Sequence, residues 1–163
     1  MTAEAPWESD PASSAMTPAA PEHGCDGPAT LVVGVDGSDT AWRALYYALG
    51  LARRQRTTVI AVYAAPTAVS VYDATIVGAV EQTSLQICDE LQPAIHALAD
   101  DYGVRTEFIS RAGDPVNALT TVATERRADA LIIGASHALI HRVVGSKATR
   151  AVRKCPCPVT VVP

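Results

Sequence analysis

The stretch LVVGVDGS, residues 31–38, is typical of the first strand and first turn of a parallel α/β sheet. Its first five residues form a nearly continuous apolar run that is rich in β-branched side chains, which suits a strand buried on both faces. Asp36-Gly37-Ser38 then signals a turn, and Ser38 or Asp39 can cap a helix that follows it. This strand, turn and helix unit predicts an α/β fold.

The rest of the chain repeats the same alternation. We predict further strands over residues 57–64, 104–110, 130–133 and 159–162, separated by helices that begin near residues 39, 73, 115 and 146. Pro93 should kink or split the long helix over residues 73–102. The strand over residues 104–110 alternates apolar and polar side chains, so we place it near a sheet edge. Helical crossovers between strands predict a three-layer α/β sandwich with a five-stranded parallel sheet, which is a Rossmann-like architecture.

Composition divides the chain into an arm and one domain. The chain has 163 residues, of which 48% are apolar; this is enough for one sizeable core and too little for two ordinary domains. Residues 1–29 contain five prolines, five acidic side chains and no Lys or Arg, without helical or strand periodicity. We therefore predict a disordered acidic arm over residues 1–29 and a single domain over residues 30–163.

Net charge and hydropathy argue against several partners and cellular locations for this protein. The formal net charge of −4 disfavours nonspecific binding to nucleic acid or to an anionic membrane surface. No signal-peptide pattern opens the sequence, and no apolar run reaches the length of a membrane-spanning helix. By elimination we expect a cytoplasmic protein.

The four cysteines do not suggest a disulfide framework in a chain of this length. Cys155-Pro156-Cys157 stands out as a thiol or metal pair, but a tetrahedral zinc site needs four ligands and usually has CxxC pairs. We therefore expect ordinary buried or half-buried thiols and no metal site.

The topology predicts where a ligand would bind. In an open parallel sheet, ligands bind outside the carboxyl ends of the strands, where the strand order reverses. If the first strand is central, the reversal falls between it and the strand over residues 130–133. Both strands lead into glycine-marked segments, residues 34–38 and 134–146. The crevice between the first and fourth strands is thus the candidate binding site.

Several side chains in these two segments suit a phosphorylated nucleoside. Gly145-Ser146-Lys147 stands at a helix start, where backbone N–H groups and the positive helix end attract an anion. Arg142 and Lys147 add positive charge, and Asp36 can accept hydrogen bonds from a ribose. Each signal also has a simpler role, since Gly145-Ser146 can merely shape a helix start and Asp36 can cap a helix. The two segments together favour ligand binding.

The sequence offers no set of catalytic residues. A P-loop, a GxGxxG turn after the first strand and a GxSxG nucleophile motif are all missing. His137 and His141 lie in the segment on the phosphate side, where they can contact a ligand or simply be solvated. We therefore expect a binding protein and not an enzyme.

Five short motifs, taken in order, resemble the universal stress protein family. They are VDGS at residues 35–38, GDP at 113–115, LIIGAS at 131–136, VGS at 144–146 and CPVTVVP at 157–163. The resemblance covers residues 30–163 and leaves the arm unexplained. It implies the family's UspA-like domain, a five-stranded parallel sandwich of the adenine-nucleotide-hydrolase-like type, and a homodimer formed through the C-terminal strand.

Family members that bind ATP share the loop G-x2-G-x9-G-[ST]. Here Gly134 matches the first glycine and Gly145-Ser146 match the closing pair, while His137 stands at the middle glycine and the spacing after it is two residues short. A Cβ at position 137 can block backbone approach to phosphate, and Arg142 can replace lost N–H contacts with charge. The resemblance places adenosine contacts on Asp36, Ala64 and Ile133.

Two functions follow from the resemblance. The first is a regulatory module of the stress response that binds an adenine nucleotide, with ATP as the expected ligand and very slow hydrolysis at most. The alternative is a dimeric interaction protein of the same fold that binds no nucleotide. The segment over residues 134–146 decides between them.

Overall fold

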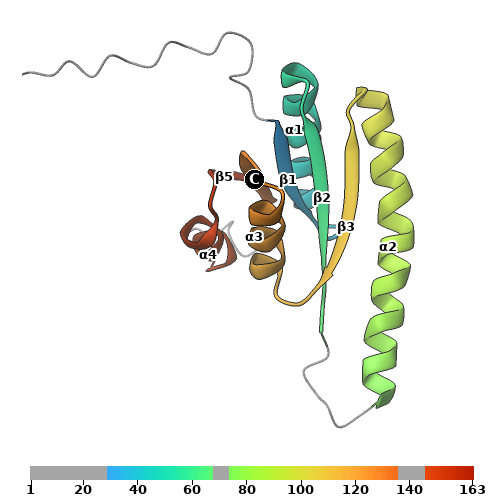
Figure 1. Ribbon diagram of the computed structural model, residues 1–163. Coiled ribbons are helices and arrows are strands. Elements are labelled where there is room, and N and C mark those ends of the chain that lie inside the picture. Colours follow the sequence, from blue (N-terminus) through green and yellow to red (C-terminus); the bar gives the residue numbers. More distant parts are fainter. Residues whose placement is uncertain (1–28, 68–73, 136–145) are drawn as a thin grey trace, which may run out of the picture.

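The structure is a computed structural model that describes residues 29–67, 74–135 and 146–163 (Figure 1). Strands and helices alternate along the chain as the sequence predicts: β1 (Thr30–Val35), α1 (Asp39–Gln55), β2 (Thr58–Ala65), α2 (Ala74–Tyr102), β3 (Thr106–Ala112), α3 (Pro115–Glu125), β4 (Ala130–Gly134), α4 (Ser146–Lys154) and β5 (Val159–Val162). The predicted arm, residues 1–29, lies outside the described residues except for Ala29.

The five strands form one sheet in the order β3-β2-β1-β4-β5, and every neighbouring pair is parallel. β1 is therefore central, and β3 lies at an edge as its alternating sequence predicts. The chain moves from β1 through β2 to β3 on one side and then crosses to β4 on the other side. The strand order thus reverses between β1 and β4, where the sequence places the binding crevice.

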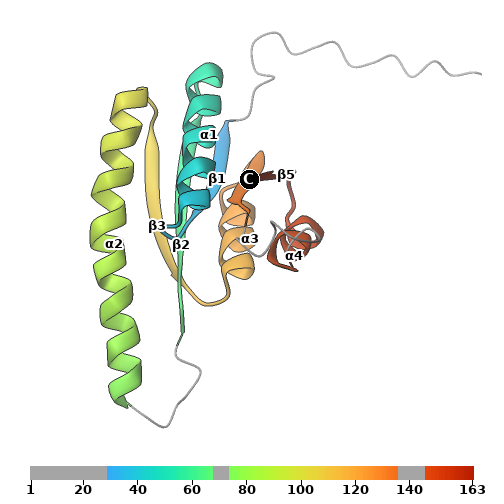
Figure 2. The same ribbon diagram turned by 180° about the vertical axis from the view of Figure 1, so that it is seen from behind.

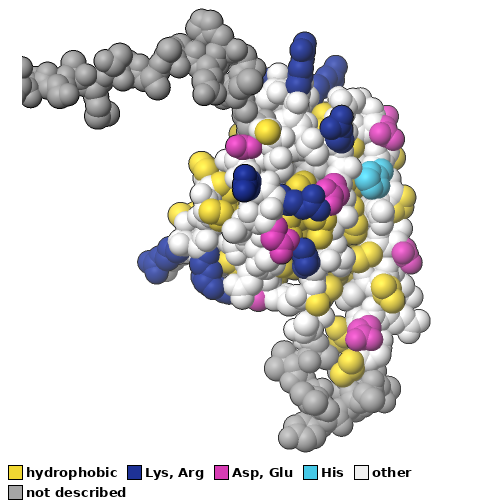
Figure 3. Space-filling view, viewed as in Figure 1, with side chains coloured by type: hydrophobic (Ala, Val, Ile, Leu, Met, Phe, Trp, Pro, Cys, Tyr) yellow, Lys and Arg dark blue, Asp and Glu magenta, His cyan; other side chains and the backbone are white. Residues whose placement is uncertain are grey.

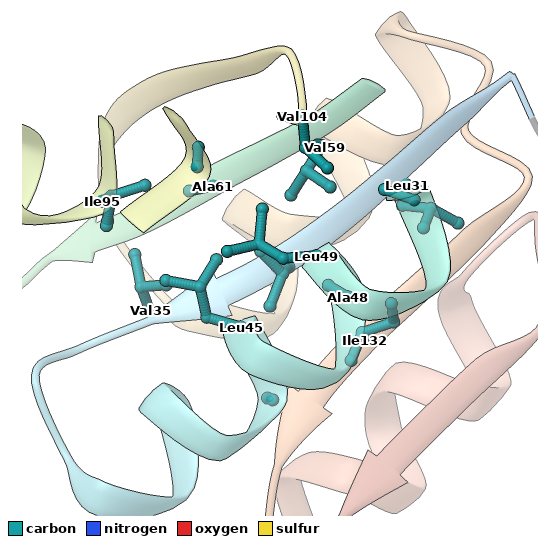
Figure 4. Close-up of a cluster of buried hydrophobic side chains, with 14 of the residues drawn as sticks. Leu31, Val35, Leu45, Ala48, Leu49, Val59, Ala61, Ile95, Val104 and Ile132 are labelled. Atoms are coloured by element: carbon teal, nitrogen blue, oxygen red, sulfur yellow. The ribbon is translucent and has the colours of Figure 1, made fainter. Parts of the chain in front are cut away.

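Helices cover both faces of the sheet and make it a three-layer sandwich. α1 and α2 pack on one face and α3 and α4 on the other, as the two opposite views show (Figures 1 and 2). Successive side chains of β1 point to opposite faces, so that Leu31 and Val33 belong to the α1/α2 core while Val32 belongs to the α3/α4 core. Figure 4 shows how Leu45 and Leu49 of α1 lie against the sheet in the first of these cores.

Helix α2 runs as one helix through Pro93, so of the kink or split predicted at this residue, the split is wrong. Proline removes one helical hydrogen bond, but tertiary packing can offset that cost. Leu91, Ile95 and Ala99 are buried around the proline and hold this part of the helix against the α1/α2 core. Among the described helices, none combines the length and apolarity that crossing a membrane would require.

Helix starts follow the predicted capping chemistry. Ser38 caps α1, because its side chain accepts a hydrogen bond from the Ala41 N–H at 3.2 Å. Asp114 caps α3 in the same way through the Asn117 N–H at 3.1 Å, and Pro115 takes the first helical position. These caps fix where each helix leaves the carboxyl edge of the sheet.

Asp114 also joins α3 to α4. Its carboxylate accepts two hydrogen bonds from the Arg150 guanidinium, at 2.8 and 3.2 Å. Lys154 adds a hydrogen bond from its Nζ to the Asn117 Oδ1 at 3.0 Å. Acidic and basic side chains lie interspersed on this face of the molecule (Figure 3). The hydrogen bonds from Arg150, and then that from the Asn117 N–H, hold the pKa of Asp114 below its usual range.

We expect Asp114→Asn to lower the thermal midpoint by a few degrees at neutral pH, since Asn still caps α3 but loses the charge that pairs with Arg150. Because the folded-state pKa of Asp114 is lowered, the stabilisation is complete above the pKa of an unfolded Asp, about 3.9, and disappears as pH falls through the lower folded value. Thermal melts of both proteins from neutral to about pH 2 should therefore converge. A difference between the two thermal midpoints that stays constant with pH would contradict a stabilising role for the charge of Asp114.

Candidate functional site

The carboxyl ends of β2, β1 and β4 lie side by side at one edge of the sheet. In the register of β1 and β2, Val35 pairs with Tyr63, so Asp36 and Ala64 follow at the same level. On the other side of β1, a Cβ built on Gly34 would lie 3.7 Å from the Cγ2 of Ile133. The structure thus brings Asp36, Ala64, Ile133 and Gly134 to one edge, around the point where the strand order reverses.

Asp36 is exposed at this edge and does not cap α1. Its Oδ1 accepts a hydrogen bond from the Ser38 N–H at 3.0 Å, which closes the turn after β1. Ser38, and not Asp36, supplies the cap. Of the two roles that the sequence left open for Asp36, helix capping is therefore excluded, and the carboxylate is exposed at the carboxyl end of β1.

Gly134 has a packing role that sequence analysis missed. A Cβ at this position would lie 2.5 Å from both the carbonyl carbon and the oxygen of Thr40, and 2.8 Å from the Ala41 nitrogen. These are backbone atoms of the first turn of α1, so the end of β4 passes directly against that helix start. A glycine immediately after an apolar strand is the sequence signal that could have indicated such a close approach.

Ile133 and Ala64 offer half-buried apolar surface at the same edge. Ile133 packs against the α3/α4 core, and its backbone pairs with Val161 of β5. Ala64 stands two residues after Val62, whose side chain belongs to the same core, and therefore faces α3 and α4 as well. Two of the three predicted adenosine contacts, Ala64 and Ile133, thus lie on one face of the sheet.

The predicted phosphate contacts fall mostly outside the described residues. This is the case for His137, Arg142 and Gly145, and also for His141. Ser146 and Lys147 open α4, as predicted, and their side chains are not described. The backbone at Ser146 therefore marks the beginning of the helix whose N-terminus the sequence assigns to an anion.

The described surface has two hollows, and the first lies beside Asp36, because both Val35 and Gly37 line it. The first is a narrow apolar space between β1, α1 and α2, lined by residues such as Val35, Trp42 and Leu91, and too small to hold a water molecule. The other is a groove of about 250 Å³ lined by Thr120, Thr121, Thr124, Glu125 and Lys154. Neither hollow contains a predicted site residue.

The described cysteines are free and half-buried, as expected. They are Cys88 on α2 and the pair Cys155 and Cys157 between α4 and β5; Cys25 lies outside the described residues. Within the described ranges, no group of three or more His, Cys, Asp or Glu side chains is placed to hold a metal ion.

The geometry can be compared with that of known proteins. A relative from Methanocaldococcus jannaschii, the universal stress protein MJ0531, is 28% identical over 143 residues, which cover 81% of this chain and 80% of the relative. The solved structure of the universal stress protein UspA from Lactobacillus plantarum superposes with a TM-score of 0.68 at 23% identity, covering 82% of this chain and 97% of that one.

Solved structures of this fold include complexes with adenine nucleotides. The universal stress protein from Archaeoglobus fulgidus, in complex with dAMP, has a TM-score of 0.62 at 23% identity, and the match covers 82% of this chain and 97% of that one. A universal stress protein in complex with cAMP has a TM-score of 0.59 at 24% identity. A universal stress protein family protein from Arabidopsis thaliana with AMP bound has a TM-score of 0.61 at 20% identity. At these identities they establish the shared fold.

The family assignment rests on a direct match of sequence. The model of the universal stress protein family matches residues 29–163, which is the whole of the described domain with its connecting segments. The five-stranded parallel sheet agrees with it. The chain therefore belongs to the universal stress protein family.

Proposed function

We propose that this protein binds an adenine nucleotide, with ATP as the expected ligand, and serves as a regulatory module of the stress response. The binding site would be the crevice between the carboxyl ends of β1 and β4. The observation that carries the proposal is the exposed carboxylate of Asp36 beside Ile133 and Gly134 at the point where the strand order reverses.

Different residues at the crevice would contact the ribose, the base and the phosphates of the nucleotide. Asp36 would accept hydrogen bonds from the ribose hydroxyls. Ile133 and Ala64 would lie beside the base, since both face the same side of the sheet. The phosphates would lie at the N-terminus of α4, near Ser146 and Lys147.

The segment that leads into α4 would complete the phosphate side. Gly145, which has no side chain, would leave room for a phosphate, and Arg142 would add charge in a segment that is two residues shorter than the family pattern. His137 would stand where that pattern has its middle glycine. Solved structures of this fold that hold cAMP, dAMP or AMP support an adenine nucleotide as the ligand.

The test is binding by the purified full-length chain. We expect adenine nucleotide to be released when protein purified without added nucleotide is denatured, and titration calorimetry to detect ATP binding. Arg142→Ala should weaken ATP more than adenosine, because its partner would be a phosphate. If millimolar ATP, ADP and AMP give neither heat nor a thermal shift, the nucleotide proposal is wrong and the dimeric interaction protein becomes the better function.

We propose that the protein binds the nucleotide and is not an enzyme that hydrolyses it. Phosphoryl transfer needs a group that positions the attacking water and acidic ligands for Mg²⁺. Asp36, the exposed carboxylate directly after β1, would instead contact the ribose in this proposal. Hydrolysis of ATP bound to the protein should therefore be very slow at most.

We also propose a homodimer formed through β5. This strand lies at the edge of the sheet, and Val161 is 36% exposed there, so its backbone and an apolar side chain are open to a second copy. Light scattering at tens of micromolar should give twice the monomer mass, and Val161→Lys should shift the protein toward monomer by charging the edge. A monomeric parent protein would rule out this interface.

The domain boundary is a further prediction. Ala29 and Thr30 donate their N–H groups to the Asp129 Oδ2 at 2.8 and 2.9 Å, which anchors the start of β1. Deleting residues 1–28 preserves both donors, so we expect the thermal midpoint to change by no more than a few degrees. A larger loss would mean that the acidic arm packs on the domain.

A further inference from the structure

The connection from α4 to β5 brings two thiols into contact. Cys155 and Cys157 are separated by Pro156, and their Sγ atoms lie 3.3 Å apart. Both side chains are half-buried and pack against the α3/α4 core, beside Val159 at the start of β5. The chain bends at Pro156 and Cys157, which turns the two sulfurs toward each other.

This pair lies at the end of the sheet opposite the proposed nucleotide crevice. It precedes β5, and the Pro158 carbonyl next to it accepts a hydrogen bond from the N–H of Leu131, near the beginning of β4. Asp129, which anchors the start of β1, is close enough to act electrostatically on Cys157. Oxidation of this pair can therefore be tested independently of nucleotide binding.

We propose that Cys155 and Cys157 form a reversible, peroxide-sensitive dithiol site. A disulfide bond is about 2.0 Å long, so rotation of the side chains has to bring the two sulfurs closer from their present 3.3 Å. A disulfide closed across a single residue between half-exposed cysteines belongs to the labile class that reductants readily reopen. Transient disulfides of this kind also occur where thiols are normally kept reduced.

The oxidation proceeds in two balanced steps. In the first, one thiol is oxidised by hydrogen peroxide to a sulfenic acid, and one water is released. In the second, the other sulfur attacks the sulfenic sulfur, the S–S bond forms, the S–O bond breaks, and the hydroxyl leaves with the thiol proton as a second water. Two thiols and one peroxide thus give one disulfide and two waters.

The environment of the pair affects how readily it reacts. Burial, and then the hydrogen bond with Cys155, raise the pKa of Cys157 to about 12. A protonated thiol is a poor nucleophile, so this environment slows the reaction of Cys157. The two balanced steps and their product are the same whichever of the two sulfurs is oxidised first.

Tryptic mapping of the full-length chain gives a sharp test. Cleavage after Lys154 releases residues 155–163, which contain both cysteines of the pair, while Cys25 and Cys88 fall in other peptides. After peroxide treatment and alkylation, we expect this nonapeptide to have lost two hydrogens and to carry no alkyl label. Treatment with dithiothreitol before alkylation should restore both labels, and the peptides with Cys25 and Cys88 should stay labelled throughout.

Single variants separate the disulfide from general oxidation. Cys157→Ser and Cys155→Ser each keep one thiol of the pair, so each should give a sulfenic acid that dimedone traps and no disulfide within residues 155–163. Cys88→Ser is the matched control and should behave like the parent protein. The proposal is overturned if residues 155–163 stay fully labelled after peroxide, or if the oxidised cysteine is found joined to Cys25 or Cys88.

Discussion

Replacing Gly134 by alanine should destabilise the fold by about 3 kcal/mol or more, the upper end of the range for overpacking. The added Cβ would lie 2.5 Å from two backbone atoms of Thr40 and 2.8 Å from the Ala41 nitrogen. Backbone in the first turn of α1 cannot rotate away as a side chain can, so β4 and α1 would have to separate. Urea denaturation of parent and variant measures the effect directly.

Two other glycines provide matched controls for this prediction. A Cβ on Gly34 would meet the methyl groups of Leu119 at 3.1 and 3.3 Å, and this flexible side chain can shift. Gly34→Ala should therefore cost only about 1 kcal/mol. Gly78 lies within α2 with nothing within 4 Å of its Cβ position, so Gly78→Ala should stabilise by about 0.5–1 kcal/mol. If Gly134→Ala is no worse than Gly34→Ala, the close contact with α1 is not rigid.

The Gly134 result also bears on the ligand site. The family pattern assigns this glycine to the nucleotide loop, whereas the structure shows that it is needed where β4 passes α1. A loss of nucleotide binding in a Gly134 variant would therefore not identify a ligand contact. Variants that keep the fold intact are required for that purpose.

Asp36→Ala should weaken ATP binding roughly 10- to 100-fold while the domain stays folded. Hydrogen bonds to a charged group contribute about 1.5–3 kcal/mol each, and the proposed ribose contact would lose its acceptor. The side chain is exposed and its described hydrogen bond, to the Ser38 N–H, lies within one turn. Ser38 continues to cap α1, so the thermal midpoint should change little.

Asp39→Ala is the matched control for this variant. Asp39 is also an exposed acidic residue, three positions further along the chain, but it lies in the first turn of α1. Its loss should cost a few tenths of a kcal/mol of stability through the helix dipole and leave ATP affinity unchanged. Titration calorimetry on the three proteins decides the matter. Equal affinities for parent and Asp36→Ala would remove Asp36 from the site.

Sequence patterns were sufficient to predict those features of the fold that depend on near neighbours in the chain. The apolar run at the start of β1, the cap at Asp114 and the proline after it depend on near neighbours in the chain, and all three were predicted correctly. The split at Pro93 was wrong, because burial of Ile95 and its neighbours keeps α2 intact. A pattern within one helix does not show how strongly the sheet holds that helix.

The candidate site shows the same division. That the strand order reverses between β1 and β4 followed from the alternation of strands and helices, together with a central first strand, and the structure confirms it. The capping role of Asp36, left open by the sequence, was excluded only when Ser38 was found at the cap. The contact of Gly134 with α1 and that of Cys155 with Cys157 are properties of packing and of a local bend.

The sequence by itself determined the fold class and the order of strands and helices, because these depend on periodicity, capping and turn chemistry between residues close together in the chain. It also indicated the family, through the resemblance of five short motifs, and predicted the end of the sheet at which to look for a ligand. The tertiary structure alone decided which glycine meets backbone and which thiols touch. These depend on distances between atoms that packing sets to within a few tenths of an ångström, and no local pattern encodes them.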